Sequence, residues 1–288
     1  TVPGEASVLA GTMVVAGGSL DAETLLVRGT GAQFSAGAGI VAVNSAHVAH
    51  GGRIDLMIGQ SLTVAGTTTV ESGGTVLLDG GDITNSNLHE QGGDFIFASG
   101  ELHFSSPLLA IAPAGPLGSN VVLGSSQTLS VAGTTTISQK GALYLEGGTF
   151  ITGQLVLDSP DAILVASSGA LQVDELVATG GATLAVENDQ SIDIQGSLRI
   201  DANSSLLLAG GMLSVSQINN NGGTVDFTSG VLQLTSADWT VGAAGLLGTE
   251  VTFSEDQALT VSGATTLESA ATLTVDGGSL TTSEIVSQ

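Results

Sequence analysis

The sequence predicts an all-β protein that winds as a right-handed parallel β-helix, or β-solenoid, with about 20–21 residues and three short strands per coil. Two observations predict this fold: a motif that recurs at nearly constant spacing, and apolar residues that alternate with polar ones in pairs about every seven residues. Helical spacing of apolar residues is not sustained anywhere. A β-sandwich or propeller would need antiparallel hairpins and more aromatic residues than the 3% present.

The repeat is clearest in three closely similar segments. They read QSLTVAGTTTVESGGTVLLDGG from Gln60, QTLSVAGTTTISQKGALYLEGG from Gln127 and QALTVSGATTLESAATLTVDGG from Gln257, and a more divergent copy begins at Gln190. Long and short steps between these glutamines alternate, as 67-, 63- and 67-residue units, and one long and one short unit form a 130-residue superrepeat. We interpret the short unit as three coils and the long unit as three coils with a small insertion. We therefore expect one continuous solenoid over residues 1–288, with repeat starts near 60, 127, 190 and 257.

Each coil is expected to contain strands with one buried face. Period-2 alternation places alternate side chains on the same face of a strand, and Gly, Asn, Ser and Asp between the apolar pairs supply the turns. The apolar positions of one repeat are Ile192/Ile194, Ile200, Leu206/Leu208, Leu213/Val215, Val225/Phe227 and Leu232/Leu234. A single coil cannot fold alone, because its backbone groups pair only with the coils above and below. About 14 coils spaced ~4.8 Å apart would form a rod roughly 65 Å long.

The charge of the chain excludes several classes of partner. Four Lys and Arg residues stand against 27 Asp and Glu residues, so the formal net charge is −23. Such a surface repels nucleic acid and anionic membranes, and it attracts cations. No run reaches the roughly 18 apolar residues of a membrane span, so we expect no membrane insertion of this segment. The chain has no Cys, which excludes disulfides, thiol chemistry and Cys-ligated zinc.

In its composition and repeat pattern, the chain resembles bacterial extracellular β-solenoid surface proteins. The resemblance rests on Val and Leu alternation, on a high content of Gly, Ser and Thr, and on recurring glycine-containing motifs such as TVLLDGG and TLTVDGGSL. The similar families are autotransporter passenger domains and filamentous-haemagglutinin-like repeat adhesins, and the resemblance covers essentially the whole chain. It implies an exported structural or adhesive rod, extracellular or on the bacterial cell surface. It carries over no catalytic residue.

Enzymatic activity is not expected. Parallel β-helices host polysaccharide lyases and hydrolases, so a carbohydrate-active enzyme or a carbohydrate-binding solenoid is the alternative to a rod. That alternative needs acids aligned on neighbouring coils of one face. The close acid pairs are Asp79/Asp82, Asp158/Asp161, Asp174/Glu175 and Glu187/Asp189. The superrepeat does not preserve them, since Asp79 corresponds to Ala209 and Asp82 to Met212, so we interpret them as solvated turn residues and expect no catalytic residue.

No cofactor and no dedicated metal site are expected. The histidines are His47, His50, His89 and His103. They form no zinc-binding motif, and the chain has no GGxGxDxU calcium repeat, so weak surface binding of calcium is the most that its acids predict. A weaker alternative is ice or mineral binding through the Thr clusters that follow Gly66, Gly133 and Gly263. Thr is equally a good strand residue.

The insertions of the 67-residue units are the candidate contact sites. They correspond to two small, apolar loops, residues 110–118 and 240–248, and loops on a rigid scaffold often carry function. The candidate partner-contact residues are Leu109, Ile111, Pro113, Pro116, Leu117, Trp239, Val241, Leu246 and Leu247. An exposed Trp239 would contact a partner directly. The alternative is a turn that tucks its leucines back onto the rod.

The ends of the sequence show no polar capping helix. Solenoids protect their open strand edges with caps, so we expect these edges to be surfaces for self-association. The expected partners are therefore another copy of the chain, stacked end to end in a filament, or an unknown cell-surface or carbohydrate ligand. A cut from a longer chain is the favoured explanation for the missing caps, and end-to-end stacking is the other; the open edges are expected to self-associate in both cases.

Overall fold

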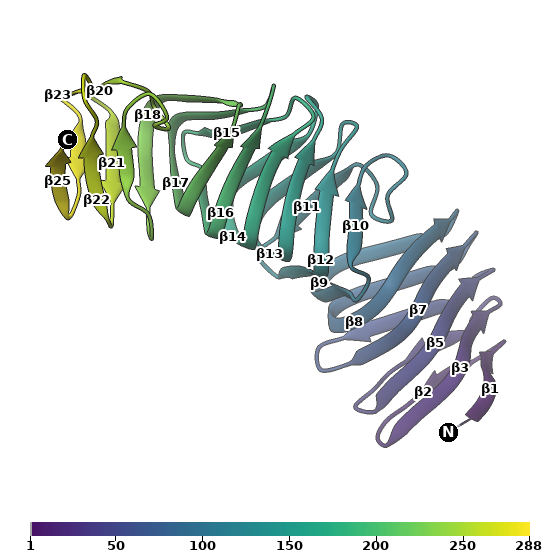
Figure 1. The fold of residues 1–288 in the computed structure, drawn as a ribbon. Helices are drawn as coiled ribbons and strands as arrows, with labels where there is room; N and C mark the ends of the chain where they lie inside the picture. The colour runs from purple at the N-terminus through teal and green to yellow at the C-terminus, as the bar shows by residue number, and fades with distance from the viewer. Residues whose placement is uncertain (1) are drawn as a thin grey trace.

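The computed structural model describes residues 2–288 and shows a rod of parallel β-strands stacked in about 13 turns of roughly 21 residues (Figure 1). The chain is a β-solenoid. The described residues contain no helix. There is therefore no helix among them that could cross a membrane. The number of turns is slightly below the 14 expected, because residues 112–119 and 242–249 form loops outside the regular coils.

The strands fall into three stretches along the chain. The first holds β1 (Val2–Val8), β2 (Thr12–Val14), β3 (Ser19–Arg28), β4 (Gln33–Ser35), β5 (Ile40–Ala49), β6 (Arg53–Met57), β7 (Ser61–Glu71), β8 (Thr75–Gln91) and β9 (Asp94–Phe104). The second holds β10 (Leu108–Ile111), β11 (Asn120–Gly124), β12 (Gln127–Ile137), β13 (Ala142–Asp158), β14 (Ile163–Thr179), β15 (Thr183–Glu187), β16 (Ser191–Asp201), β17 (Ser205–Asn221) and β18 (Thr224–Leu234). The third holds β19 (Trp239–Val241), β20 (Glu250–Ser254), β21 (Gln257–Val261), β22 (Ala264–Leu267), β23 (Thr272–Asp276), β24 (Ser279–Thr281) and β25 (Glu284–Ser287).

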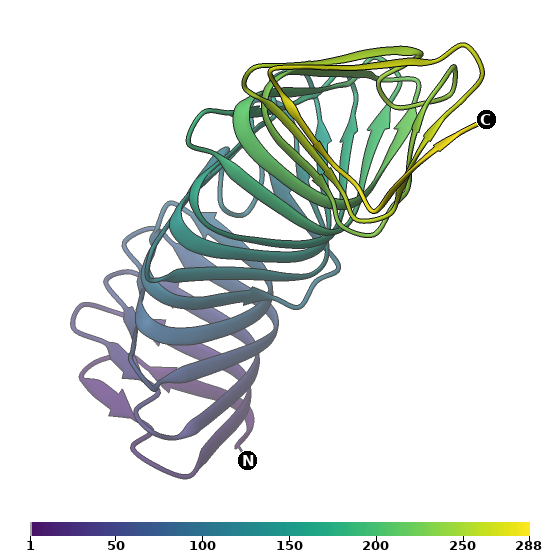
Figure 2. The ribbon, with the colours of Figure 1, turned by 90° about the vertical axis from the view of Figure 1, so that its left-hand side faces the viewer.

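Each regular coil supplies one segment to each of three faces, and the outline of the last coils is triangular in Figure 2. We define face A as the stack that includes residues 61–64, face B as the stack that includes residues 67–71, and face C as the stack that includes residues 75–78. Long strands turn the corners between faces, so β7 runs from face A to face B. The three strand segments of each coil match the prediction, although segments on neighbouring faces are often joined through the corner into one long strand.

Alternating burial sets the register of the stack. On face A, Leu62 pairs with Val41 below and with Ile83 above, and all three side chains are buried. A one-residue slip would turn these side chains to solvent. One hydrophobic core cluster runs from Ala6 to Val261. The period-2 pattern thus buries one side of most strands, as the sequence predicts, whereas β2 and the C-terminal strands β23, β24 and β25 contain no buried residue.

The Gly-Gly pair of the repeat lies at the corner between faces C and A. Gly147 has a φ of 100°, in the left-handed region that L side chains rarely adopt. Gly148 approaches the preceding coil so closely that an added Cβ would lie 2.6 Å from the carbonyl oxygen of Gly124. The corner therefore requires both glycines for different reasons, which explains their recurrence.

Strand pairing is interrupted at three places, and at each of them one face stays paired. At junction 1, face A joins β9 to β12, whereas residues 87–91 on face B and 94–97 on face C have pairing partners only in the preceding coil. At junction 2, face A joins β18 to β21, while faces B and C restart as separate sheets. Between them, β14 joins β16 only through residues 175–178 and 197–200. Figure 1 shows the stack opening between β8 and β10.

Candidate functional site

Four cavities lie at junctions 1 and 2. On face B, junction 1 holds a cavity of about 880 Å³ between residues 87–91 and the segment 108–118. The corresponding cavity of junction 2 has about 240 Å³. On face C each junction has a further cavity of about 160 Å³. Both insertion loops therefore line cavities at the breaks in the stack.

A polar residue in a core position marks the floor of each junction. Glu90 stacks on Val70 and Asn220 stacks on Ile200, and both aliphatic side chains are fully buried. Glu90 and Asn220 are exposed, because the next coil does not pair with these segments. A carboxylate enclosed in the core would cost several kcal/mol. The sequence is thus adapted to an opening at both positions.

Glu90 gives junction 1 a negative charge. It lines both cavities of this junction. Although the residue is exposed, partial burial of the Glu90 carboxyl raises its pKa above the usual range, and the neighbouring Asp94 carboxylate raises this pKa further. No Lys or Arg belongs to the lining of the four cavities. Within the described part of the chain, His89 is the one basic side chain that lines a cavity of this junction, and the charge at the floor has no Lys or Arg beside it there.

Aromatic packing closes junction 2 more than junction 1. The ring of Trp239 lies 5.8 Å from that of Phe253, which lies 6.2 Å from the ring of Phe227 in the preceding coil. The corresponding positions of junction 1 hold Leu109 and Leu123 in place of Trp239 and Phe253. These smaller side chains leave about 880 Å³ where junction 2 has about 240 Å³.

A glutamine of each repeat spans face C at both junctions. The side-chain amide of Gln127 donates to the carbonyl of Phe97, and its Oε1 accepts from the backbone amide of Gly124 at 2.6 Å. Gln257 repeats this pattern at junction 2, where it donates to the carbonyl of Phe227. These contacts replace backbone pairing that is missing on face C, so the opening there stays narrow.

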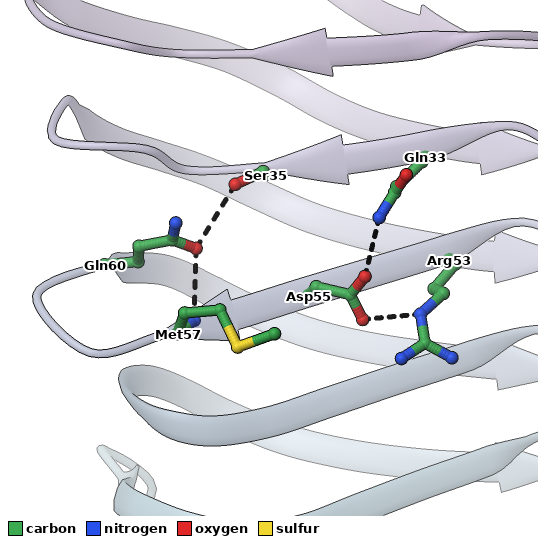
Figure 3. Close-up of polar contacts among 6 residues, drawn as sticks. All are labelled: Gln33, Ser35, Arg53, Asp55, Met57 and Gln60. Atoms are coloured by element: carbon green, nitrogen blue, oxygen red, sulfur yellow. Dashed lines mark hydrogen bonds and ion pairs between the residues drawn. The ribbon is translucent and has the colours of Figure 1, made fainter.

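The equivalent glutamine of an uninterrupted coil has other partners. Oε1 of Gln60 accepts from the backbone amide of Met57 at 3.1 Å and from the hydroxyl of Ser35 at 3.2 Å (Figure 3). Beside it, Asp55 forms an ion pair of 2.6 Å with Arg53. The contact between Ser35 and Gln60 links successive coils on face C, as does the hydrogen bond of 2.7 Å that the side-chain amide of Gln33 donates to Asp55. The ladder is continuous there, and these contacts add to its backbone pairing.

The structure divides the candidate contact residues into two groups. The buried ones are Leu109, Ile111, Trp239 and Val241. The exposed or partly buried ones are Pro113, Pro116, Leu117, Leu246 and Leu247. Of the two interpretations of Trp239, direct contact through an exposed ring does not hold: its side chain is 3% exposed, because β19 turns the indole inward onto Phe253. The leucines of both loops pack against the core, as the alternative predicted.

The structure brings most of these residues to the junctions. Leu109, Pro113 and Pro116 line the large cavity of junction 1, and Leu117 lines the smaller one. At junction 2 the lining residues are Trp239, Leu246 and Leu247. Ile111 and Val241 are buried in the core and line none of the four cavities.

Sequence reasoning missed the floor of the junctions. Glu90 and Asn220 lie one superrepeat apart and therefore occupy the same position within it. Each replaces an aliphatic residue of the preceding coil, Val70 or Ile200. This shared substitution of a polar for an aliphatic residue is the sequence feature that could have indicated the junctions. It can be recognised only when the strands are aligned in their stacking register.

The other candidate residues do not form a site. The middle Thr residues of the repeated clusters, Thr68, Thr135 and Thr265, are fully buried, so they face the core rather than the surface. The ring nitrogen Nδ1 of His103 lies 2.7 Å from the hydroxyl of Ser130. Residues 2–288 contain no group of three or more His, Cys, Asp and Glu side chains that could hold a metal ion.

Comparison with known proteins identifies no family. No protein-family model matches the chain, and no curated protein matches it. Among solved structures, the C-terminal domain of tapirin from Caldicellulosiruptor kristjanssonii is 12% identical, with 99% of this chain and 90% of that chain covered and a TM-score of 0.23. A similarity at this level supports neither a shared fold nor a shared function.

Proposed function

We propose that the chain is an extracellular structural or adhesive rod of a bacterial cell surface. The observation that supports it best is the single core cluster that extends along the stack. Charged side chains lie outside this core, and Asp55 is the one charged residue buried among those described. A stiff, acidic and Cys-free rod of this kind holds surfaces apart and presents the loops at its junctions to a partner.

Self-association end to end is the second part of the proposal. The outermost coils carry the exposed apolar residues Leu9 and Val14 on one side and Val275 and Ile285 on the other. Exposed strand edges readily pair with another chain. Stacking of one rod on the next would bury these residues and extend the solenoid into a filament.

The carbohydrate-active alternative has less support at the junctions. Acid-catalysed cleavage of a glycosidic bond generally uses two carboxyl groups that flank the bond. Each of the four cavities is lined by one acidic residue: Glu90 in both cavities of junction 1, and Asp238 or Glu250 at junction 2. The junctions thus fit a binding role better than hydrolysis.

Negative-stain electron microscopy of the purified chain across concentrations, with and without calcium, tests this proposal. Fibres one solenoid wide that lengthen with concentration would support a filament. Separate rods, roughly 60 Å long for 13 turns spaced ~4.8 Å apart, would support a rod that acts through its junctions. Compact globules at every concentration would contradict both. The calcium arm shows whether a divalent cation must screen the net charge of −23 before rods associate.

A further inference from the structure

Junction 1 exposes two strand edges on face B. Residues 87–91 have strand partners only in the preceding coil, and β10 has a partner only in the following strand β12, within the described residues. The unpaired backbone groups of both edges can accept a further strand. A guest strand between them would pair on both sides, whereas an ordinary sheet edge offers pairing on one.

The cavity at this position has the size of a binding site. Its volume of about 880 Å³ lies within the roughly 300–1,000 Å³ typical of ligand pockets. Both strand edges line it, and Pro113 and Pro116 of the insertion loop form a further wall. Leu88 and Leu109 line it from the two sides as buried side chains, and Leu108 is the exposed apolar residue of the lining. The lining thus combines backbone pairing groups with apolar contacts, which is how extended peptides are recognised.

The charge of the cavity indicates the chemistry of the guest. Glu90 lies on the floor, where partial burial and, to a smaller extent, the neighbouring Asp94 carboxylate raise the pKa of its carboxyl. A cationic group placed against Glu90 would relieve this repulsion and stabilise the ionised carboxylate. The overall charge of −23 favours the approach of the same kind of partner.

We propose that junction 1 binds an extended cationic peptide segment as an added β-strand, with a Lys or Arg side chain against Glu90. The guest backbone pairs with residues 87–91 and with β10, and its apolar side chains contact Leu109 and the loop prolines. This inference goes beyond the rod function and does not depend on it, because a rod without a guest is still a rod. Failure of either test therefore leaves the other intact.

Junction 2 serves as an internal comparison. Asn220 replaces Glu90 there, and Trp239 replaces Leu109. The corresponding cavity has about 240 Å³, and its one acidic lining residue is Asp238 rather than a residue at the position of Glu90. The structure therefore assigns the peptide site to junction 1 and gives two substitutions that would convert it to the state of junction 2.

Fluorescence anisotropy with labelled peptides tests the proposal on the full chain. The probes are a seven-residue peptide of alternating Thr and Val with a central Lys, the same peptide with Glu in place of Lys, and a Lys peptide whose alternate backbone amides are methylated. The expected result is saturable binding of the first peptide only. Methylation removes the donors that strand pairing needs, and the Glu peptide meets the charge of Glu90.

Three variants locate the binding. Leu109→Trp fills the cavity with the residue that junction 2 carries and is expected to weaken binding of the Lys peptide at least tenfold. Glu90→Gln is expected to reduce the preference for Lys over Glu, and this exposed position tolerates an amide, as Asn220 shows. Trp239→Leu alters junction 2 alone and is expected to leave binding unchanged. Circular dichroism of each variant confirms that the solenoid is retained.

Several results would overturn the inference. These are absence of binding by the Lys peptide, equal binding of the Lys and Glu peptides, equal binding of the methylated peptide, or unchanged affinity in folded Leu109→Trp. Binding that Trp239→Leu abolishes would place the guest at junction 2. Displacement of the peptide by a neutral oligosaccharide would assign the cavity to a carbohydrate instead.

Discussion

At the scale of single residues, Gly148 has no room for a side chain. An added Cβ would lie 2.6 Å from the carbonyl oxygen of Gly124 and 2.7 Å from Cβ of Leu123. Gly148→Ala is therefore expected to lower the free energy of unfolding by about 1–3 kcal/mol. Gly153 lies in the same strand, where the nearest atom to an added Cβ is 3.4 Å away, so Gly153→Ala is expected to be close to neutral. Chemical denaturation of both variants measures this, and equal losses would contradict it.

Residue-level prediction from the sequence succeeded where a pattern was local. The alternation of Leu206 and Leu208 predicted burial correctly, because side-chain direction in a strand depends only on parity. The burial of Trp239 was left open, although Trp239 and Val241 flank Thr240 with the same alternation. Placing the loop boundary at Thr240 separated the tryptophan from its strand, and the core contacts of its ring come from residues distant in sequence.

At the scale of elements, β10 shows how an interrupted coil differs from a regular one. The repeat length predicted that the 67-residue units contain an insertion, but its effect on pairing depends on how the loop directs the chain. Residues 112–119 leave β10 and β11 paired only with the following coil. Sequence spacing alone does not encode this direction. The opening of the stack therefore could not be predicted from the sequence, whereas the coils themselves could.

Hydrogen exchange should distinguish these elements. The alternate amides of β10 that point into junction 1 have no strand partner, and solvent-exposed amides exchange rapidly. Residues 134–137, on the same face in β12, pair with β10 on one side and β13 on the other, so their amides are expected to be protected for much longer. Mass spectrometry of peptic fragments measures both segments. Equal protection of β10 and of residues 134–137 would mean that junction 1 is closed in solution.

At the scale of the whole molecule, the solenoid combines one continuous core with uneven coupling between coils. The stability of a stacked protein is approximately a sum of terms within coils and between neighbouring coils. Most neighbouring coils pair on three faces, whereas the coils at the three interruptions pair on one. The interruptions are therefore the weakest interfaces, and the rod consists mechanically of four blocks: residues 2–97, 101–173, 183–227 and 239–288.

Unfolding under force should reveal these blocks. When the chain is pulled by its ends in an optical trap, we expect four main steps, because an interface paired on one face separates before one paired on three. At ~3.3–3.6 Å per extended residue, the steps should lengthen the chain by roughly 150 to 350 Å. Leu109→Trp should raise the force at which the first boundary opens, since the indole adds contacts across junction 1 as Trp239 does across junction 2. One step for the whole rod, or many short steps of roughly 70 Å that each release a single extended coil, would show that coupling between coils is uniform and that the interruptions carry no mechanical role.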